Sequence, residues 1–276
     1  MLKTRVITAV ALLVFLLALL ALDSYPLIVL ACALFFGAAS WEALRLFGMA
    51  RAPFGAAVWT ALFIYLAFNR APPDARVLFG LCSAIWLLRL APVLAIGLPP
   101  LQSASNRLLT GIYGIAILGC FFAMLTLYRH SGIYLFSVMA LVWIADIGAF
   151  FTGKAFGRRK LAPTISPGKS WEGAIGGWLA VLICAGLCIA VRDALPLLSD
   201  TFAVRLQAKA GWLVWLAVLS LIAVASVVGD LFESQLKRRA EVKDSSQLLP
   251  GHGGVLDRID ALIPVLPFAV LVDILI

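Results

Sequence analysis

Apolar runs follow one another along almost the whole chain, and they restrict its fold more than any other feature. A helix that crosses a bilayer needs roughly 20 mainly apolar residues. Nine runs reach or approach that length, and short segments that often contain proline separate them. They cover residues 6–22, 27–47, 54–68, 77–98, 108–128, 133–151, 171–191, 212–232 and 261–276. The pattern predicts an all-α, polytopic integral membrane protein with about nine transmembrane helices, of which the third and ninth are the shortest.

The composition agrees with this class, since 63% of the residues are hydrophobic and only 13% are charged. A soluble domain is about half apolar and a quarter charged. The longest polar connectors have about thirty residues, which leaves no room for a separate soluble domain. The first run could belong to a signal peptide. It is long, however, and no small-x-small cleavage site precedes Asp23, so we expect an uncleaved first span.

The basic residues predict an orientation for these spans. With the N-terminus inside, most Lys and Arg residues fall in inner segments, where the positive-inside rule expects them. The inner set is Lys3, Arg5, Arg45, Arg51, Arg107, Lys154, Arg158, Arg159, Lys160, Lys169, Lys237, Arg238, Arg239, Lys243 and Arg258. The outer set is Arg70, Arg76, Arg129, Arg192, Arg205 and Lys209. This places loops 152–170 and 233–260 in the cytoplasm. The net charge of +8 therefore indicates contact with anionic lipid headgroups and not binding of nucleic acid.

Residues 230–260 concentrate charge in a chain that otherwise has little. The carboxylates of this stretch are Asp230, Glu233, Glu241, Asp244, Asp257 and Asp260. The spacing of Asp230, Glu233, Ser234 and Lys237 puts them on one face of a helix that continues out of the eighth span. A carboxylate at membrane depth needs a cavity, a cation or a polar partner. Taken alone, Asp230 could equally be an interfacial residue wetted by water among the lipid headgroups.

The second half of this stretch favours a chemical role. Asp257 and Asp260 are again three residues apart at the start of the last span, and the turn of residues 250–254 carries glycines that let the backbone approach a ligand. Two helix ends would then direct Asp230 toward Asp257 and Asp260. Mg²⁺ binds through one or two carboxylates together with substrate phosphates. Basic side chains that suit phosphate lie beside them, namely Lys237, Arg238, Lys243 and Arg258. This layout is typical of phosphoryl or nucleotidyl transfer; the alternative is a salt-bridge network at the membrane surface.

The other inner loop adds a second group of anion-binding candidates. Asp146 lies within the sixth run, where a carboxylate is a functional candidate. Ser166, Lys169 and Ser170 precede a helix start, where backbone N–H groups favour an anion. The segment lacks the full phosphate-loop motif and a preceding strand, so a P-loop NTPase is excluded. The alternative is ordinary N-capping by Ser170, with Glu172 in the first turn and Lys169 in a purely topological role.

At these residues the chain resembles the phosphatidate cytidylyltransferases, or CDP-diacylglycerol synthases. The signature pattern runs without departure through Ser234-x-Leu236-Lys237-Arg238, Lys243-Asp244-x-Ser246, Leu249-Pro250-x-His252-Gly253-Gly254-Val255 and Asp257-Arg258-Ile259-Asp260. Upstream, Asp146, Gly153-Lys154, Phe156-Gly157 and Ser166-Pro167-x-Lys169-Ser170-Trp171-Glu172-Gly173 are also similar to that family. The resemblance covers roughly residues 140–276, and the first 130 residues resemble the family only as a hydrophobic multispan region.

The resemblance implies an activity and a setting. It implies transfer of CMP from CTP to phosphatidic acid, giving CDP-diacylglycerol and pyrophosphate. It also implies Mg²⁺ dependence, a bacterial inner membrane and a homodimer. By motif match, Asp230 and Asp257 would be the metal ligands of a site with one or two cations. The chain would then comprise an N-terminal multispan region (1–130) and a catalytic membrane region (131–276) with its active site at the cytoplasmic face.

The residues and the resemblance together give a set of candidate site residues. The candidate catalytic residues are Asp230, Asp257, Asp260, Lys237 and Arg258. The candidate substrate-binding residues are Ser166, Lys169, Arg238, Lys243, Asp244 and His252. His252 either donates a hydrogen bond or shapes the glycine turn. No general base is required, since a phosphate monoester is already anionic near pH 7.

Two other functions fit parts of the pattern. A transporter of an anionic substrate would use Arg89, Asp146 and Asp230 at membrane depth, but the charges crowd at one face and no inverted repeat is evident. A CTP-dependent lipid-alcohol kinase would share the need for Mg²⁺ and basic residues, and it would also need a base to deprotonate the alcohol.

Overall fold

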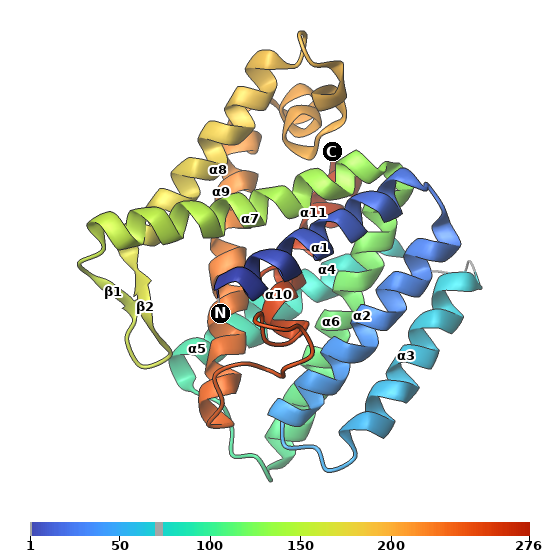
Figure 1. Ribbon diagram of the computed structural model, residues 1–276, viewed down its shortest axis with the longest axis vertical. Coiled ribbons are helices and arrows are strands. Elements are labelled where there is room, and N and C mark those ends of the chain that lie inside the picture. The colour runs from blue at the N-terminus through green and yellow to red at the C-terminus, as the bar shows by residue number, and fades with distance from the viewer. Residues whose placement is uncertain (1, 70–73) are drawn as a thin grey trace.

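Helices occupy all nine of the predicted apolar ranges. The computed structural model describes residues 2–69 and 74–276, without the side chains of Leu2, Lys3 and Arg5. Arg70, which the charge pattern assigns to the outer side of the membrane, is not among the described residues. The long helices run mostly alongside one another, and α7 and α1 cross them obliquely (Figure 1).

The elements follow one another with few irregular connections. The helices of the first half are α1 (Leu2–Ala21), α2 (Tyr25–Leu46), α3 (Ala52–Phe68), α4 (Ala75–Ile85), the π-helix η1 (Trp86–Leu90), α5 (Ala91–Ile96) and α6 (Ala104–His130). The second half contains α7 (Gly132–Phe156), β1 (Lys160–Ala162), β2 (Ser166–Ser170), α8 (Trp171–Val191), the 3-10 helix η2 (Pro196–Asp200), α9 (Phe202–Arg239), α10 (Leu256–Ile259) and α11 (Leu262–Leu275).

Several helix ends are set by local sequence. Ser103, Ser131 and Ser170 cap α6, α7 and α8, and each hydroxyl accepts a hydrogen bond from a backbone N–H three residues later. A capping hydroxyl satisfies one of the donors that the first turn of a helix leaves free. The N-capping interpretation of Ser170 is therefore confirmed. Gly211 interrupts α9 with a φ of +77°, so a straight apolar helix begins at the predicted position 212.

Six helices in the described residues are long and apolar enough to cross a membrane. They are α2, α4 with η1 and α5, α6, α7, α8 and α9. The apolar parts of α1 and α3 are shorter, and α11 has 14 residues. An integral membrane protein built from helices is therefore confirmed.

The helix ends gather at two opposite ends of the bundle. At one end, Arg239 donates to the Asn106 side chain (2.8 Å) and to the Pro99 carbonyl (2.9 Å), and Thr8 donates to the Pro250 carbonyl (2.9 Å). At the other end, Tyr128 donates to Asp23 (3.0 Å). There too, His130 lies 3.2 Å from Asp200, and Tyr134 donates to Asp273 (2.7 Å). Successive long helices thus alternate in direction between the two ends.

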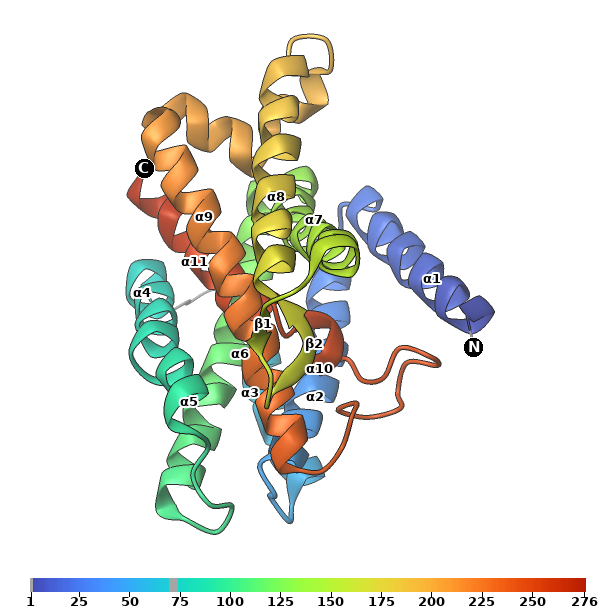
Figure 2. The same ribbon diagram turned by 90° about the vertical axis from the view of Figure 1, so that its left-hand side faces the viewer.

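One element departs from the all-α prediction. Strands β1 and β2 form an antiparallel hairpin in which Lys160 pairs with Ser170 and Ala162 pairs with Ser166. The predicted loop before α8 is therefore partly a hairpin, and Lys169 lies on a strand. Figure 2 shows this hairpin against α9, with which β2 is in contact. Nothing in the short polar sequence here has the alternation of apolar residues that predicts a strand.

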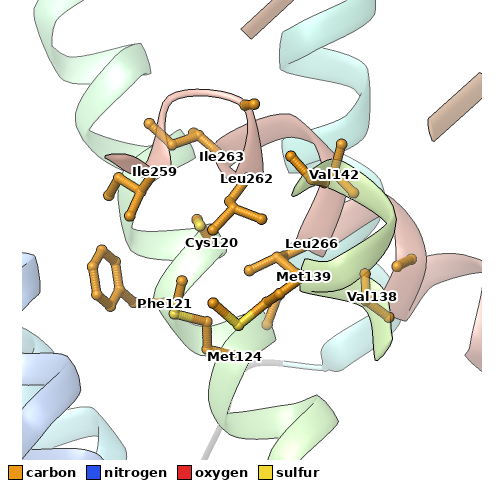
Figure 3. Packing of buried hydrophobic residues seen from close by; sticks show 14 of the residues in the cluster. Cys120, Phe121, Met124, Val138, Met139, Val142, Ile259, Leu262, Ile263 and Leu266 are labelled. Atoms are coloured by element: carbon orange, nitrogen blue, oxygen red, sulfur yellow. The ribbon is translucent and has the colours of Figure 1, made fainter. Parts of the chain in front are cut away.

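The hydrophobic core joins the two halves of the chain. Cys120, Phe121 and Met124 of α6 pack against Met139 of α7 and Leu262 of α11 (Figure 3). Packing of this kind lets apolar helices associate without polar contacts. The division at residue 130 stays a prediction, and the core crosses it.

Candidate active site

A cavity of about 640 Å³ lies where α7, α8, α9, α10 and the hairpin meet. Most of the predicted site residues line it. They are Asp230, Asp257, Asp260, Lys237, Arg258, Ser166, Lys169 and Asp244. Residues from both predicted inner loops therefore share one cavity.

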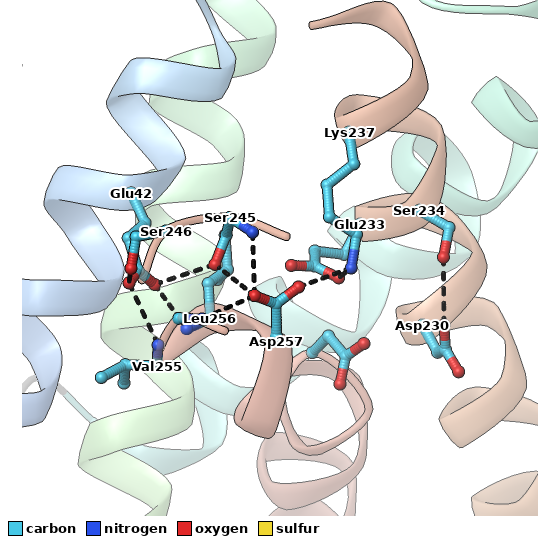
Figure 4. A network of polar contacts seen from close by, with 12 residues as sticks. Glu42, Asp230, Glu233, Ser234, Lys237, Ser245, Ser246, Val255, Leu256 and Asp257 are labelled. Atoms are coloured by element: carbon cyan, nitrogen blue, oxygen red, sulfur yellow. Dashed lines mark hydrogen bonds and ion pairs between the residues drawn. The ribbon is translucent and has the colours of Figure 1, made fainter. Parts of the chain in front are cut away.

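Asp257 is held by four hydrogen bonds (Figure 4). Its Oδ1 accepts from Lys237 Nζ at 2.6 Å. Its Oδ2 accepts from the Ser245 backbone N–H, the Ser245 hydroxyl and the Gly254 N–H, each at 2.8 Å. Burial acts to raise the pKa of Asp257, but Lys237 and these donors outweigh it and hold the pKa below the ordinary value. Asp257 is thus an ionised carboxylate with a fixed orientation.

Asp230 is held by fewer contacts, one of which comes from the hairpin. Its Oδ2 lies 2.5 Å from Lys169 Nζ, and its Oδ1 accepts from the Ser234 hydroxyl at 3.2 Å. The pairing of Lys160 with Ser170 and the capping of α8 by Ser170 fix the backbone beside Lys169. The Lys169–Asp230 ion pair is therefore one contact that joins the two charged segments inside the cavity.

Two more carboxylates accompany this pair. Glu233 is fully buried and forms an ion pair with Lys237, which also bridges to Asp257. Asp260 lines the cavity and accepts a hydrogen bond from the Ala261 N–H at 2.8 Å. Burial, with the charge of Asp230 nearby, raises the pKa of Asp260 to about 8. Asp260 is therefore mostly protonated near pH 7, whereas Asp257 in the same cavity is ionised.

Three predicted residues do not line this cavity. Arg238 is exposed, and its Nε donates to the Ile165 carbonyl at 3.2 Å in the hairpin. Lys243 is exposed on the segment after α9. His252 lines a different cavity. A sequence pattern gives the order of residues along the chain but not the direction of each side chain. The pattern therefore included these three residues in the site although their side chains point elsewhere.

That second cavity is apolar and has a volume of about 430 Å³. Side chains from α1, α2, α6 and α7 form most of its wall, including Leu12, Phe35 and Trp143. His252 and Arg258 line it from the signature segment, and Arg258 also lines the first cavity. One arginine thus lies between a polar cavity and an apolar one.

The sequence marked Asp146 as a functional candidate without assigning it a role, and it gave no role to Ser226 or Glu42. Asp146 of α7 and Ser226 of α9 line the first cavity, and the Ser226 hydroxyl is buried without a partner in the described residues. Glu42 of α2 is fully buried and binds the signature segment. It is the one carboxylate in its apolar run, and a lone carboxylate in a predicted span is a signal that could have identified it.

The residues of the first cavity fit a Mg²⁺ ion. Across residues 2–69 and 74–276, no three His, Cys, Asp or Glu side chains converge closely enough to hold a metal by themselves. Mg²⁺ does not need such a cage, because it combines one or two carboxylates with water and substrate phosphates. Asp230 and Asp257 supply carboxylates, and the lysines now paired with them show that both favour a cation. Their metal role stays a prediction.

Known proteins are similar to this chain over half or nearly all of its length. Residues 3–275 match the model of the cytidylyltransferase family. A phosphatidate cytidylyltransferase of Pseudomonas aeruginosa is 40% identical over 280 residues, which cover 97% of this chain and 95% of that protein. One from Haemophilus influenzae is 51% identical over 140 residues, covering 50% of this chain and 45% of that protein. One from Thermotoga maritima is 42% identical over 136 residues, covering 49% of this chain and 47% of that protein. The chain belongs to the cytidylyltransferase family.

Proposed function

We propose that this protein transfers CMP from CTP to phosphatidic acid, forming CDP-diacylglycerol and pyrophosphate. The relatives named above carry this activity in their names, and the most extensive match covers nearly the full length of both chains. The observation that carries the proposal is a cavity in which carboxylates and lysines from two distant segments meet, next to an apolar cavity. A reaction between a nucleoside triphosphate and a lipid needs a charged cavity for the triphosphate and an apolar one for the acyl chains.

The reaction itself is a substitution at phosphorus. An oxygen of the lipid phosphate attacks the α-phosphorus of CTP, a new P–O bond forms, and the bond to the β-phosphate oxygen breaks as pyrophosphate leaves. Asp230 and Asp257 would hold Mg²⁺, which neutralises phosphate charge when it is bound. Lys169 and Lys237 already lie at these carboxylates and can turn to phosphate oxygens. Catalysis would then rest on positioning and charge neutralisation.

The two cavities suggest where the two substrates lie. The polar cavity suits the triphosphate, because lysines that can bind phosphate oxygens and carboxylates that can hold Mg²⁺ both line it. The apolar cavity suits acyl chains, since its wall is formed by aliphatic and aromatic side chains. Arg258 lines both cavities and is therefore our candidate for binding the lipid phosphate between them.

The wider setting is also part of the proposal. Nine membrane crossings are supported by the alternation of the helices between two ends of the bundle. The excess of Lys and Arg at the end that holds the site favours a cytoplasmic active site and a cytoplasmic N-terminus. The bacterial relatives favour the inner membrane, where CTP is available from the cytoplasm. A homodimer remains an expectation from the family resemblance.

One assay tests the activity against the other functions. Purified protein in detergent receives Mg²⁺, phosphatidic acid and CTP labelled at either the α- or the γ-phosphate. We expect α-label in the lipid and γ-label in pyrophosphate, and we expect chelation of Mg²⁺ to abolish both. With diacylglycerol in place of phosphatidic acid, transfer of label from the γ-position to this lipid alcohol would identify a kinase. Absence of turnover together with anion flux in liposomes would identify a transporter.

A further inference from the structure

Glu42 is a charged residue in an unexpected place. It lies on α2, its exposed fraction is 0%, and its neighbours along the helix are mostly apolar. A buried carboxylate is costly unless hydrogen bonds or cations compensate it. No Lys, Arg or His lies within ion-pair distance of Glu42 in the described residues, so hydrogen bonds must hold it.

Those hydrogen bonds all come from the signature segment, more than 200 residues away in the sequence (Figure 4). Oε1 accepts from the Ser246 hydroxyl at 2.5 Å and from the Val255 N–H at 3.1 Å. Oε2 accepts from the Leu256 N–H at 2.6 Å and from the Ser245 hydroxyl at 3.2 Å. The Glu42 carboxylate thus binds two parts of the loop before Asp257, residues 245–246 and residues 255–256.

One of these donors connects Glu42 to Asp257. The Ser245 hydroxyl lies 3.2 Å from Glu42 Oε2 and 2.8 Å from Asp257 Oδ2, so its single O–H, which donates to one carboxylate at a time, lies within hydrogen-bond distance of both. Gly254 donates its N–H to Asp257. A Cβ atom at Gly254 would lie 2.4 Å from Glu42 Oε1 and 2.1 Å from Ser245 Oγ, so the backbone approaches this closely only because the residue is glycine.

Glu42 itself is absent from the lining of both cavities. It therefore has no path to substrate, and any effect on the reaction must pass through Ser245, Gly254 and the backbone before Asp257. We propose that Glu42 is a positioning residue, which fixes the orientation of the Asp257 carboxylate from outside the active site. This inference rests on the proposed role of Asp257 as a cation ligand.

The test measures cation binding as well as turnover. Mn²⁺ serves as a spectroscopic probe for the purified protein, because its unbound fraction is visible by electron paramagnetic resonance. Groups that orient a metal ligand contribute about 10- to 100-fold to metal affinity or activity. We expect Glu42→Gln to weaken Mn²⁺ binding and lower kcat by about that factor, with KM for phosphatidic acid nearly unchanged. Glu42→Asp, which keeps the charge, should lie between Gln and the wild type.

Two further variants separate positioning from a loss of fold. Ser245→Ala leaves Glu42 with three donors and removes the shared hydroxyl, so it should lower Mn²⁺ affinity, and a Tm that stays well above the assay temperature shows that the variant is still folded. In the double variant with Glu42→Gln, the two effects should be less than additive, because both act through the same contact. Ser40→Ala, a buried polar residue of the same helix without these contacts, is the matched control and should keep wild-type Mn²⁺ binding.

This test distinguishes a failure of the positioning role of Glu42 from a failure of the proposed function. Wild-type protein that binds Mn²⁺ but transfers no CMP would overturn the proposed function, and the Mn²⁺ affinity of Glu42→Gln would still judge the role of Glu42. Unchanged Mn²⁺ affinity and kcat in Glu42→Gln would overturn the positioning role. So would strictly additive losses with Ser245→Ala.

Discussion

Asp257 and Asp230 line the same cavity, yet the chain holds them in different ways. Asp257 accepts four hydrogen bonds from Lys237, Ser245 and Gly254, which all lie within 20 residues of it along the chain. Asp230 has the Ser234 hydroxyl beside it and an ion pair with Lys169 of the distant hairpin. One carboxylate is built into its own segment, and the other depends on a contact between two segments.

Solvent exposure sharpens this difference. The side chains of Lys237 and Asp257 are 13% and 4% exposed, whereas those of Lys169 and Asp230 are 25% and 29% exposed. Charges that are shielded from water interact more strongly and are costly to leave unpaired. The Asp257 side of the site is therefore part of the stable structure, and the Asp230 side is freer to exchange Lys169 for a cation or a phosphate.

Replacing each carboxylate by its amide should give the largest effects. Asp257→Asn and Asp230→Asn are both expected to lower turnover by at least about 100-fold, since each removes a charge that the reaction needs. Only Asp257→Asn should also lower Tm, by roughly 5 °C, because it leaves Lys237 short of a buried partner and turns an amide toward N–H donors. Activity assays and thermal unfolding in detergent measure both. Equal Tm values for the two variants would remove the distinction drawn here.

Lys169→Ala should have a smaller effect that is confined to the Asp230 side. A partly exposed ion pair contributes about 1 kcal/mol, so we expect kcat/KM to fall by roughly fivefold. Tm should change little. Lys160→Ala is the matched control, because Lys160 is an exposed lysine of the same hairpin outside the cavity. If both variants lose activity equally, Lys169 acts only through the general positive charge of the loop.

Lys243→Ala should have the smallest effect of the series. The motif includes Lys243 among the binding residues, but its side chain is exposed and is not part of the cavity wall. We expect kcat/KM to fall by less than about threefold, from weaker long-range attraction of an anionic substrate, and this loss should shrink at high salt. A tenfold, salt-independent loss would mean that Lys243 reaches the substrate directly.

The sequence by itself determined the membrane-spanning fold and much of the site. Runs of apolar residues follow from the local cost of placing polar groups in lipid, so each predicted range became a helix. N-capping by Ser170, which the sequence offered as an alternative to anion binding, follows from its immediate neighbours. The carboxylates Asp230, Asp257 and Asp260 stood out because charge is rare near a membrane, and all three line one cavity.

Only the tertiary structure decided which of these residues meet. Lys169 pairs with Asp230 because a hairpin, which has no clear pattern in the sequence, folds against α9. Lys243 and His252 share the motif with Asp257 but lie away from its cavity, since a loop sends neighbouring residues in different directions. Glu42 contacts Ser245 across 203 residues, and only the packing of α2 beside that loop brings them together. Local sequence sets which residues must be buried or paired, whereas helix packing selects the partner.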